Sequence, residues 1–181
     1  MIPDIKQIVE LPYENMQLRG EVYMSHNDFE RYNAIQIENG KKEAANSRNL
    51  AAGTLRQLDP NIIKERGLHI FIFNVQQGPD AISENHIAGL DLLASKGIPV
   101  VYHKLCKTAE EVICVIDQIA EMRNTLPYDI DGAVVKINET KYRDDFPAGR
   151  KYSSGHIAYK YPPEERVVVM DDIDVAGSVS S

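Results

Sequence analysis

The alternation of apolar and polar positions along the chain predicts short strands. Residues 18–24 read LRGEVYM, and their period of two places Arg19, Glu21 and Tyr23 on one face of a half-buried strand. Three apolar runs predict further strands, over residues 68–75, 132–137 and 156–162.

Capping residues mark where helices begin and end. A short polar side chain at the N-cap satisfies a backbone N–H that has no partner within the helix. Such signals predict three helices: one over residues 27–39 opened by Asn27, one opened by Ser83 and ended by Gly97, and one opened by Thr108. Helices and strands intermix without a regular β-α-β alternation, so the sequence predicts an α+β fold with antiparallel sheets and packed helices.

Charge is unevenly distributed along the chain. The formal net charge is −7, which by itself argues against a nucleic-acid partner. Residues 41–66, however, hold six Lys or Arg against three acids, whereas residues 77–122 hold three lysines against seven acids. Because salt screens charges beyond about 10 Å, a local cationic excess is sufficient for a phosphate-binding face. The pattern fits either such a face or two ordinary solvated surfaces.

The sequence indicates a cytoplasmic protein without a membrane partner. No apolar run approaches the roughly 18 residues that a membrane span needs. The first residues carry acids and no long apolar core, unlike a secretory signal. Cys106 and Cys114 lack the C-x-x-C spacing of a metal or redox pair, so we interpret them as thiols in a reducing compartment.

The segment NSRNLAAGTLRQLDP, residues 46–60, is unusual for a surface helix. It carries Arg48 and Arg56, and mostly small or apolar residues lie between them. An ordinary amphipathic helix has more charge and fewer small side chains on its surface. The pattern indicates two cations at either end of a smooth surface and leaves open what they contact.

Three charged residues lie inside predicted strands. Lys136 and Lys160 interrupt apolar segments, and Glu21 directly follows a glycine. Because an unpaired charge in a buried strand is strongly unfavourable, each lysine must reach water, pair with an acid or meet a ligand anion. A single strand lysine is best interpreted as solvated. Two of them and a strand glutamate, beside the arginine segment, favour a ligand site.

Two further signals adjoin the Lys136 strand. Asp131 and Gly132 precede it, and a glycine there either lets the backbone approach a neighbour or ligand closely or forms a plain turn. Arg123 lies near the end of the preceding helix, where it contacts either a ligand or the negative end of the helix dipole.

Four segments together resemble a known family. RGEVYM, NSRNLAAGTLRQLDP, LPYDIDGAVVKIN and IAYKYPPEE occur in the order and approximate spacing of the adenylation domain of bacterial NAD-dependent DNA ligases. The R-N-x-A-A-G-x-L-R-Q segment is highly specific, whereas D-G-x-V-x-K and Y-K-Y-P are general signatures of covalent nucleotidyltransferases. The resemblance covers nearly the whole chain and implies the covalent-nucleotidyltransferase fold, incomplete here.

The resemblance implies an enzyme of DNA replication and repair. Such a ligase transfers AMP from NAD to its own lysine, then to the 5′-phosphate of nicked double-stranded DNA, and then seals the nick, with NAD and Mg²⁺ as cofactors. Arginines offer planar, permanently charged donors to phosphates, so Arg48 and Arg56 would contact the nicotinamide nucleotide or nick phosphates. The resemblance implies a contact for each of five other residues. Glu21 would contact the adenosine ribose, Lys136 adenine or phosphate, and Lys160 the α-phosphate. Asp131 would contact a metal or the nucleophile, and Arg123 would contact phosphate.

The chain departs from this family at the nucleophile. The family uses the lysine of a K-x-D-G motif upstream of RGEVYM, and the 181 residues contain no K-x-D-G. We therefore interpret residues 1–166 as a partial adenylation domain and residues 167–181 as a tail or the truncated start of the oligonucleotide-binding barrel. Ser47 stands where the family usually has proline, and residues 154–156 stand where it usually has Pro-Arg-Trp, on the approach to Lys160.

Two functional classes compete. The first is the core of an NAD-dependent DNA ligase, and the second is a non-catalytic remnant that binds nucleotide or DNA without forming lysyl-AMP. A third class, the ATP-dependent ligases and capping-type enzymes, is argued against by the R-N-x-A-A-G-x-L-R-Q segment. Without the strand that bears the nucleophile, a sheet edge is exposed, so self-association through that edge is a further expectation.

Overall fold

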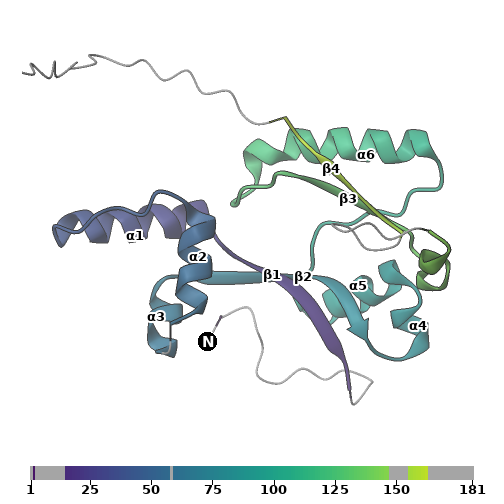
Figure 1. Ribbon diagram of the computed structural model, residues 1–181, viewed down its shortest axis with the longest axis horizontal. Coiled ribbons are helices and arrows are strands. Elements are labelled where there is room, and N and C mark those ends of the chain that lie inside the picture. Colours follow the sequence, from purple (N-terminus) through teal and green to yellow (C-terminus); the bar gives the residue numbers. More distant parts are fainter. Residues whose placement is uncertain (1, 3–14, 58, 147–154, 163–181) are drawn as a thin grey trace, which may run out of the picture.

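The structure is a computed structural model that describes residues 2, 15–57, 59–146 and 155–162 (Figure 1). The predicted tail over residues 167–181 lies outside the described residues. No helix in the described part of the chain has the length and apolar character needed to cross a membrane.

Two small antiparallel sheets form the framework. β1 (Gln17–Met24) pairs with β2 (Leu68–Gln77), and β3 (Gly132–Lys136) pairs with β4 (His156–Lys160). All four strands lie where apolar patterning predicted them. The α+β prediction with antiparallel sheets is therefore confirmed, whereas the more specific nucleotidyltransferase fold remains a prediction.

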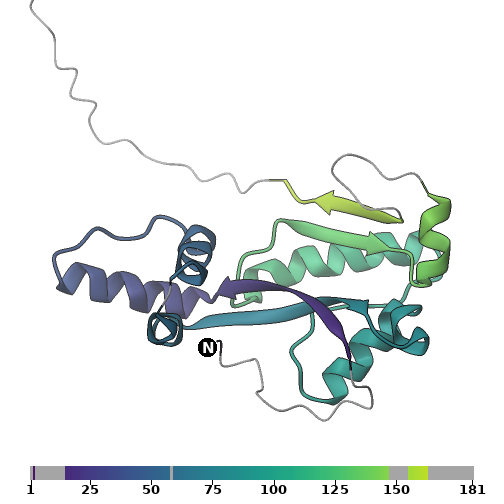
Figure 2. The same cartoon turned by 60° about the horizontal axis from the view of Figure 1, so that its bottom comes forward.

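Helices flank both sheets (Figures 1 and 2). α1, α2 and α3 gather at one end of the β1–β2 sheet, α4 and α5 lie at its other end, and α6 runs along the β3–β4 sheet. Their bounds are α1 His26–Glu38, α2 Ser47–Leu55, α3 Pro60–Glu65, α4 Asp80–Ser83, α5 His86–Ser95 and α6 Ala109–Met122, with short 3-10 helices η1 Arg123–Thr125 and η2 Thr140–Asp145.

The structure corrects two helix starts. Ser25, not Asn27, caps α1, because the Ser25 hydroxyl accepts a hydrogen bond from the Asp28 backbone N–H at 3.1 Å. Ser83 ends the short α4 and does not open a helix, and Asn85 caps α5. The predicted Thr108 cap and the end of the helix at Gly97 are confirmed.

One face of the β1–β2 sheet is the core. Met24 and Leu68 pack with Ala51 of α2, and Ile72 packs with Leu93 of α5. Since successive strand residues point to opposite faces, the other face of β1 carries Arg19, Glu21 and Tyr23, as the period of two predicted. That second face turns toward β3 and β4 (Figure 2).

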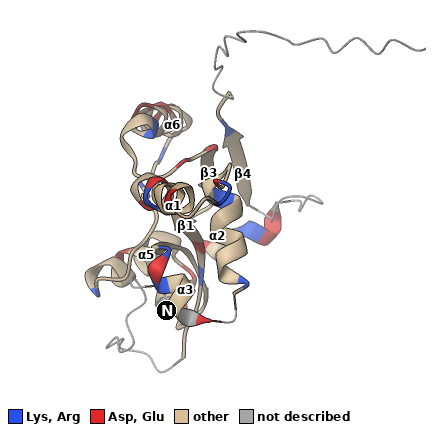
Figure 3. Ribbon diagram, turned by 90° about the vertical axis from the view of Figure 1, so that its left-hand side faces the viewer, with Lys and Arg blue, Asp and Glu red and all other residues tan. Residues whose placement is uncertain are grey.

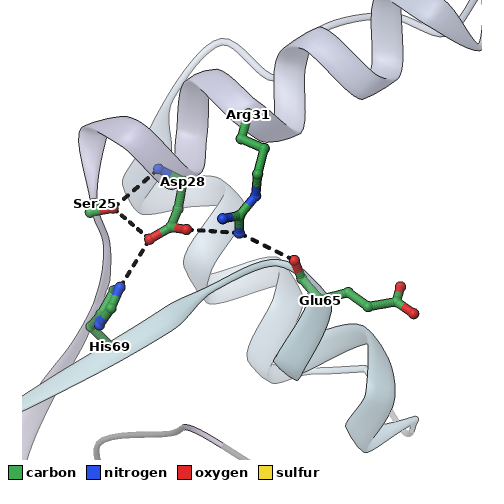
Figure 4. A network of polar contacts seen from close by, with 5 residues as sticks. All are labelled: Ser25, Asp28, Arg31, Glu65 and His69. Carbon is green, nitrogen blue, oxygen red and sulfur yellow. Dashed lines mark hydrogen bonds and ion pairs between the residues drawn. The ribbon is translucent and has the colours of Figure 1, made fainter.

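A partly buried carboxylate fixes α1 to the sheet (Figure 4). Asp28 contacts His69 Nε2 of β2 at 2.9 Å and Arg31 Nη2 at 2.7 Å, and the Ser25 hydroxyl donates to it. Burial raises the pKa of Asp28, but the hydrogen bonds from Ser25 and His69 and the charge of Arg31 outweigh it and lower the pKa overall. Arg31 also reaches the Glu65 carbonyl at 3.4 Å, so the network joins α1, α3 and β2.

A second set of contacts holds the segment before β3 against α1. The His26 backbone N–H donates to the Pro127 carbonyl at 2.8 Å, and His26 Nε2 lies 3.0 Å from Asp129 Oδ1. The Tyr128 ring packs on Tyr23 of β1, with 4.6 Å between ring centroids. These contacts place Asp131, two residues after Asp129, next to the exposed face of β1.

Candidate functional site

Four charged side chains from four separate segments meet between the two sheets. Arg48, in the first turn of α2, lies 3.6 Å from Glu21 Oε1 of β1 and 3.7 Å from Asp131 Oδ2. Lys160, the last residue of β4, lies 3.7 Å from the same Asp131 oxygen. The residues form a chain of charges, Glu21–Arg48–Asp131–Lys160, which we call the ion-pair chain. Figure 3 shows the side of the molecule on which α2 lies next to β3 and β4.

The ion-pair chain is open to solvent and loosely joined. The exposed fractions of the four side chains are 49% for Glu21, 72% for Arg48, 68% for Asp131 and 77% for Lys160. An exposed ion pair contributes only about 1 kcal/mol or less to stability. An incoming anion can therefore replace the carboxylates around Arg48 and Lys160 with little loss of folding free energy.

Two glycines let the backbones around this site approach closely. A Cβ on Gly20, next to Glu21, would lie 2.8 Å from the Phe71 carbonyl oxygen of β2. A Cβ on Gly132, next to Asp131, would lie 2.2 Å from the Tyr159 carbonyl oxygen of β4. Of the two interpretations of Gly132, close approach to a neighbouring strand is therefore the one that the structure supports.

The two strand lysines differ in environment. Of the outcomes open to a strand lysine, Lys160 reaches water and lies near an acid, because its place at the end of β4 leaves its side chain exposed. Lys136 is partly buried, and its Nζ donates to the Phe73 carbonyl of β2 at 3.0 Å and lies 5.2 Å from the centroid of the Phe73 ring. Burial, and secondarily the charge of Arg143, lowers the pKa of Lys136 to about 8.

A β-bulge provides the acceptor for Lys136. Arg19 pairs with Asn74 and Gly20 pairs with Ile72, so Phe73 is an extra residue without an opposite partner in β1. An unpaired bulge residue has a carbonyl free of the sheet ladder, and here it turns to Lys136. Phe73 was not predicted from the sequence, because residues 68–75 read as one continuous apolar run. The local signal that could have drawn attention to Phe73 is the series of ring side chains at the alternate positions 69, 71 and 73.

His86 is a second residue that sequence reasoning missed. It begins α5, and burial together with the nearby charge of Lys136 lowers its pKa to about 3. Nothing in the local sequence marks it, since its environment comes from β3 and η2 far along the chain.

The remaining predicted site residues lie near the ends of helices. Arg56 is the C-cap of α2 and is exposed, about 12 Å along the helix axis from Arg48. Arg123 is the C-cap of α6 and donates to the Pro162 carbonyl at 3.4 Å, which places it just beyond the end of β4.

The small residues of α2 have two different roles. Ala51 and Thr54 are buried against the core. Ala52 is exposed, and a Cβ on Gly53 would meet nothing within 4 Å. The smooth surface between the two arginines is thus formed by Ala52 and Gly53, and it is open rather than packed.

Part of the cationic excess over residues 41–66 is structural. Arg66 Nη1 donates to the buried Thr54 hydroxyl at 3.0 Å, and its guanidinium lies 5.1 Å from the centroid of the Tyr32 ring. Arg66 therefore braces α1, α2 and α3. Arg48 and Arg56 remain exposed at the two ends of α2.

The lowered pKa of Lys136 predicts that stability rises with pH above about 8. Between that value and the ordinary 10.5, the unfolded chain binds a proton that the folded chain does not, so the free energy of unfolding increases with pH. Urea unfolding across this range should show the rise in the wild type and lose it in Lys136→Met. The raised pKa values of Tyr128 and Tyr161 lower the stability as pH approaches the upper end of this range. They do so in both the wild type and Lys136→Met. Equal pH slopes would contradict the assignment.

Proteins commonly bind phosphate esters through exposed Arg and Lys side chains, here beside carboxylates. The profile of the NAD-dependent DNA ligase adenylation domain matches residues 1–164, and the chain belongs to this family.

Individual relatives agree with this assignment. A DNA ligase of Clostridium kluyveri is 43% identical over 161 residues, which are 88% of this chain and 24% of that ligase. DNA ligases of a Thermoanaerobacter species and of Bacillus subtilis are 39% and 36% identical over 178 residues, which are 95% of this chain and 27% of each ligase. The chain thus spans about a quarter of the length of these relatives.

The side chains fit the two implied cofactors unequally. Cations at Arg48, Lys136 and Lys160 suit the phosphates of NAD, and the Glu21 carboxylate suits sugar hydroxyls. Within the described residues, no group of three or more His, Cys, Asp or Glu side chains is arranged to hold a metal ion. The Asp131 carboxylate instead accompanies Arg48 and Lys160.

Proposed function

We propose that this chain is the nucleotide-handling core of an NAD-dependent DNA ligase. The whole reaction would transfer AMP from NAD to an enzyme lysine, then to the 5′-phosphate of nicked double-stranded DNA, and then close the nick. The observation that carries the proposal is the convergence of Glu21, Arg48, Asp131 and Lys160 in a member of the ligase family. A cytoplasmic location remains a prediction.

Lys160 and Arg48 are assigned to phosphate. Both side chains are exposed, and each lies 3.7 Å from the same oxygen of Asp131. A phosphate group that bridges them would take over the role of Asp131 as counter-ion. Preorganised cations at the reacting phosphate stabilise the charge that develops on its oxygens, and this is commonly the largest contribution to catalysis of phosphoryl transfer.

Glu21 and Lys136 are assigned to the nucleoside part. Glu21 lies at the far end of the ion-pair chain and accepts hydrogen bonds only, which suits ribose hydroxyls. Lys136 projects from β3 toward β2, where it faces the Phe73 ring and carbonyl. Its contact would be with adenine or a phosphate, and bound NAD would supply the AMP group for transfer.

Asp131 and Arg123 are assigned to the reacting end of the site. Asp131 holds Arg48 and Lys160 at equal distances, so it aligns two cations before a ligand binds. Arg123 lies beyond Lys160 at the end of β4, where it would meet phosphate. These assignments do not depend on Mg²⁺, because the described carboxylates do not form a metal cluster.

The 181-residue chain alone is expected not to become adenylated. The family forms lysyl-AMP on the lysine of K-x-D-G, and these residues contain no such motif. The measurement is the intact mass after incubation with NAD and Mg²⁺, with a full-length relative as the positive control. Addition of one AMP to any lysine of this chain would show that the expectation is wrong.

Arg48→Ala and Arg56→Ala are each expected to weaken binding of nicked duplex DNA and to lower its salt dependence. Loss of one DNA-phosphate contact reduces the slope of log affinity against log salt by about 0.9. Both side chains are exposed, so stability should change by less than about 0.5 kcal/mol.

The matched control for both arginine variants is Lys104→Ala, which removes an exposed cation from the segment between α5 and α6. Binding titrations at several salt concentrations, with thermal melts in parallel, separate contact from folding. If either arginine variant binds with the salt slope of the Lys104 variant, that arginine does not contact DNA.

A further inference from the structure

The segment that follows β3 is fastened to the start of α5. The Asn138 carbonyl accepts a hydrogen bond from the His86 backbone N–H, and Asn138 Oδ1 accepts one from the Ile87 N–H, each at 2.9 Å. The Thr140 N–H donates to the Glu84 carbonyl at 2.8 Å, just before α5 begins. We call these three hydrogen bonds the Asn138 clamp. They join two segments that are about fifty positions apart along the chain.

The clamp satisfies backbone groups that a helix cannot satisfy by itself. The first N–H groups of a helix have no partner within it. The cap of α5, Asn85, accepts from the Ala88 N–H at 3.0 Å, and Asn138 supplies the acceptors for the two N–H groups before it. A side chain without an acceptor at position 138 would therefore leave the Ile87 N–H without this partner.

α5 in turn is packed on β2. Leu93 of α5 packs with Ile72 and Val75 of β2. A Cβ on Gly89 would lie 3.0 Å from Val75 Cγ2, so helix and strand are already in close contact. A segment that is fixed to the start of α5 is therefore fixed relative to β2 as well. Figures 1 and 2 show α4 and α5 next to the end of the β3–β4 sheet.

The position of Lys136 depends on this arrangement, because its hydrogen-bond partner belongs to β2. Its Nζ donates to the Phe73 carbonyl at 3.0 Å. Asn138 follows Lys136 by two residues, so the clamp determines how far the end of β3 lies from β2. Before β3, the Pro127 carbonyl accepts from the His26 N–H of α1 at 2.8 Å. The chain is thus fastened on both sides of β3.

We propose that Asn138 is a positioning residue for AMP transfer: by fastening the end of β3 to α5, it holds Lys136 against the bulge of β2. This role rests on the proposed function, in which Lys136 contacts adenine or a phosphate. Asn138 acts through Lys136 and has no assigned contact to substrate. Asparagine suits the position because one residue offers two acceptors, its carbonyl and its side-chain oxygen, to two successive N–H groups.

The first test is the pKa of Lys136 in the complete 181-residue chain with Asn138→Leu. This variant keeps a side chain of similar shape, changes no charge and removes the Oδ1 acceptor. Once the end of β3 is released, Lys136 is less buried, and its pKa should rise from about 8 toward the ordinary 10.5. The titratable groups around this lysine are unchanged by the variant, and they include Arg143 of η2, His86 of α5 and His156 of β4.

The measurement is an NMR titration of the chain with ¹³C-labelled lysine, in which Lys136→Met identifies the signal. The matched control is Thr108→Val, which also removes a helix-capping acceptor, the one that binds the Glu111 N–H of α6 at 3.2 Å. Thermal melts of both variants should fall by similar amounts, whereas the Lys136 pKa should move only in Asn138→Leu.

The second test is the rate of lysyl-AMP formation from NAD in a full-length ligase that carries this segment. Asn138→Leu should slow this step by up to about 100-fold, the scale for a small displacement of an aligned group. Asn138→Asp keeps an acceptor for the Ile87 N–H and places negative charge at the start of α5, where the helix dipole favours it. This variant should restore both the rate and the thermal melt.

Three results would each overturn this inference. One is a Lys136 pKa that is the same in Asn138→Leu as in the wild type, or that moves equally in Thr108→Val. Another is a displaced pKa with a normal rate, which would make the clamp a purely structural feature. The third is an Asn138→Asp variant as slow as Asn138→Leu, since the acceptor would then not matter. Failure of the proposed function looks different, because the wild type itself would then form no lysyl-AMP from NAD.

Discussion

Lys160→Met, made in a full-length ligase that carries this segment, is expected to slow the formation of lysyl-AMP by at least about 100-fold. This is the usual scale for removing one preorganised contact to charge that develops in a transition state. The Lys160 side chain is 77% exposed, and the described carboxylate beside it, Asp131, is 3.7 Å away. The cation is therefore available to a phosphate rather than committed to the fold.

The fold should tolerate this change. A loose, exposed ion pair contributes about 1 kcal/mol or less, so the melting temperature should move only slightly. Relief of a buried charge plays no part here, because the Lys160 side chain is exposed. The matched control is Lys141→Met, since Lys141 is an exposed lysine of η2 whose ammonium lies over the Tyr142 ring.

The measurement is a single-turnover time course of lysyl-AMP formation from NAD, with thermal melts of both variants. A slow Lys160 variant with a normal melt, beside a normal Lys141 variant, supports a contact to the reacting phosphate. Near-normal lysyl-AMP formation in Lys160→Met would instead assign Lys160 to the structure of β4.

Gly132→Ala is expected to destabilise the chain by about 1–3 kcal/mol, the range for inserting a carbon into a packed region. The new Cβ would lie 2.2 Å from the Tyr159 carbonyl oxygen and 3.1 Å from Lys160 Cα. These are backbone atoms, so the overlap can be relieved only if β3 and β4 move apart. That movement would also separate Asp131, next to Gly132, from Lys160.

Gly53→Ala is the matched control, with an effect of the opposite sign. Gly53 lies inside α2, and a Cβ there meets nothing within 4 Å. Alanine in a helix interior is more stable than glycine by roughly 0.5–1 kcal/mol. Urea unfolding of both variants gives the comparison. If Gly132→Ala unfolds at the wild-type urea concentration, then β3 and β4 adjust freely and Gly132 is a plain turn residue.

Local periodicity determined much of the framework. The period of two in LRGEVYM placed Glu21 on the exposed face of β1 before any contact was known, because side-chain direction in a strand follows from its pleat. The Thr108 cap was predictable for a similar reason, since its hydrogen bond lies within one turn of helix. The prediction that Asn27 caps this helix is wrong because Ser25, two residues earlier, is also a good cap. Ser25 has Asp28 three residues later, where a capping box carries its acidic residue.

The candidate residues could be named from sequence because they lie in family motifs, but motifs did not determine their surroundings. Lys136 and Lys160 looked alike, each an interruption in an apolar strand. Only the packing of β3 against β2 made Lys136 a partly buried cation with a pKa of about 8. The open end of β4 made Lys160 an exposed one.

By itself, the sequence determined the four described strands, the three longest of the described helices, the family and the identity of the charged candidates, because local patterns and motifs carry that information. Only the tertiary structure decided that Arg48 lies between Glu21 and Asp131, and that the bulge at Phe73 provides an acceptor for Lys136. The physical reason is that burial, ion pairing and the supply of hydrogen-bond partners depend on which distant segments pack together. No local pattern of residues records that packing.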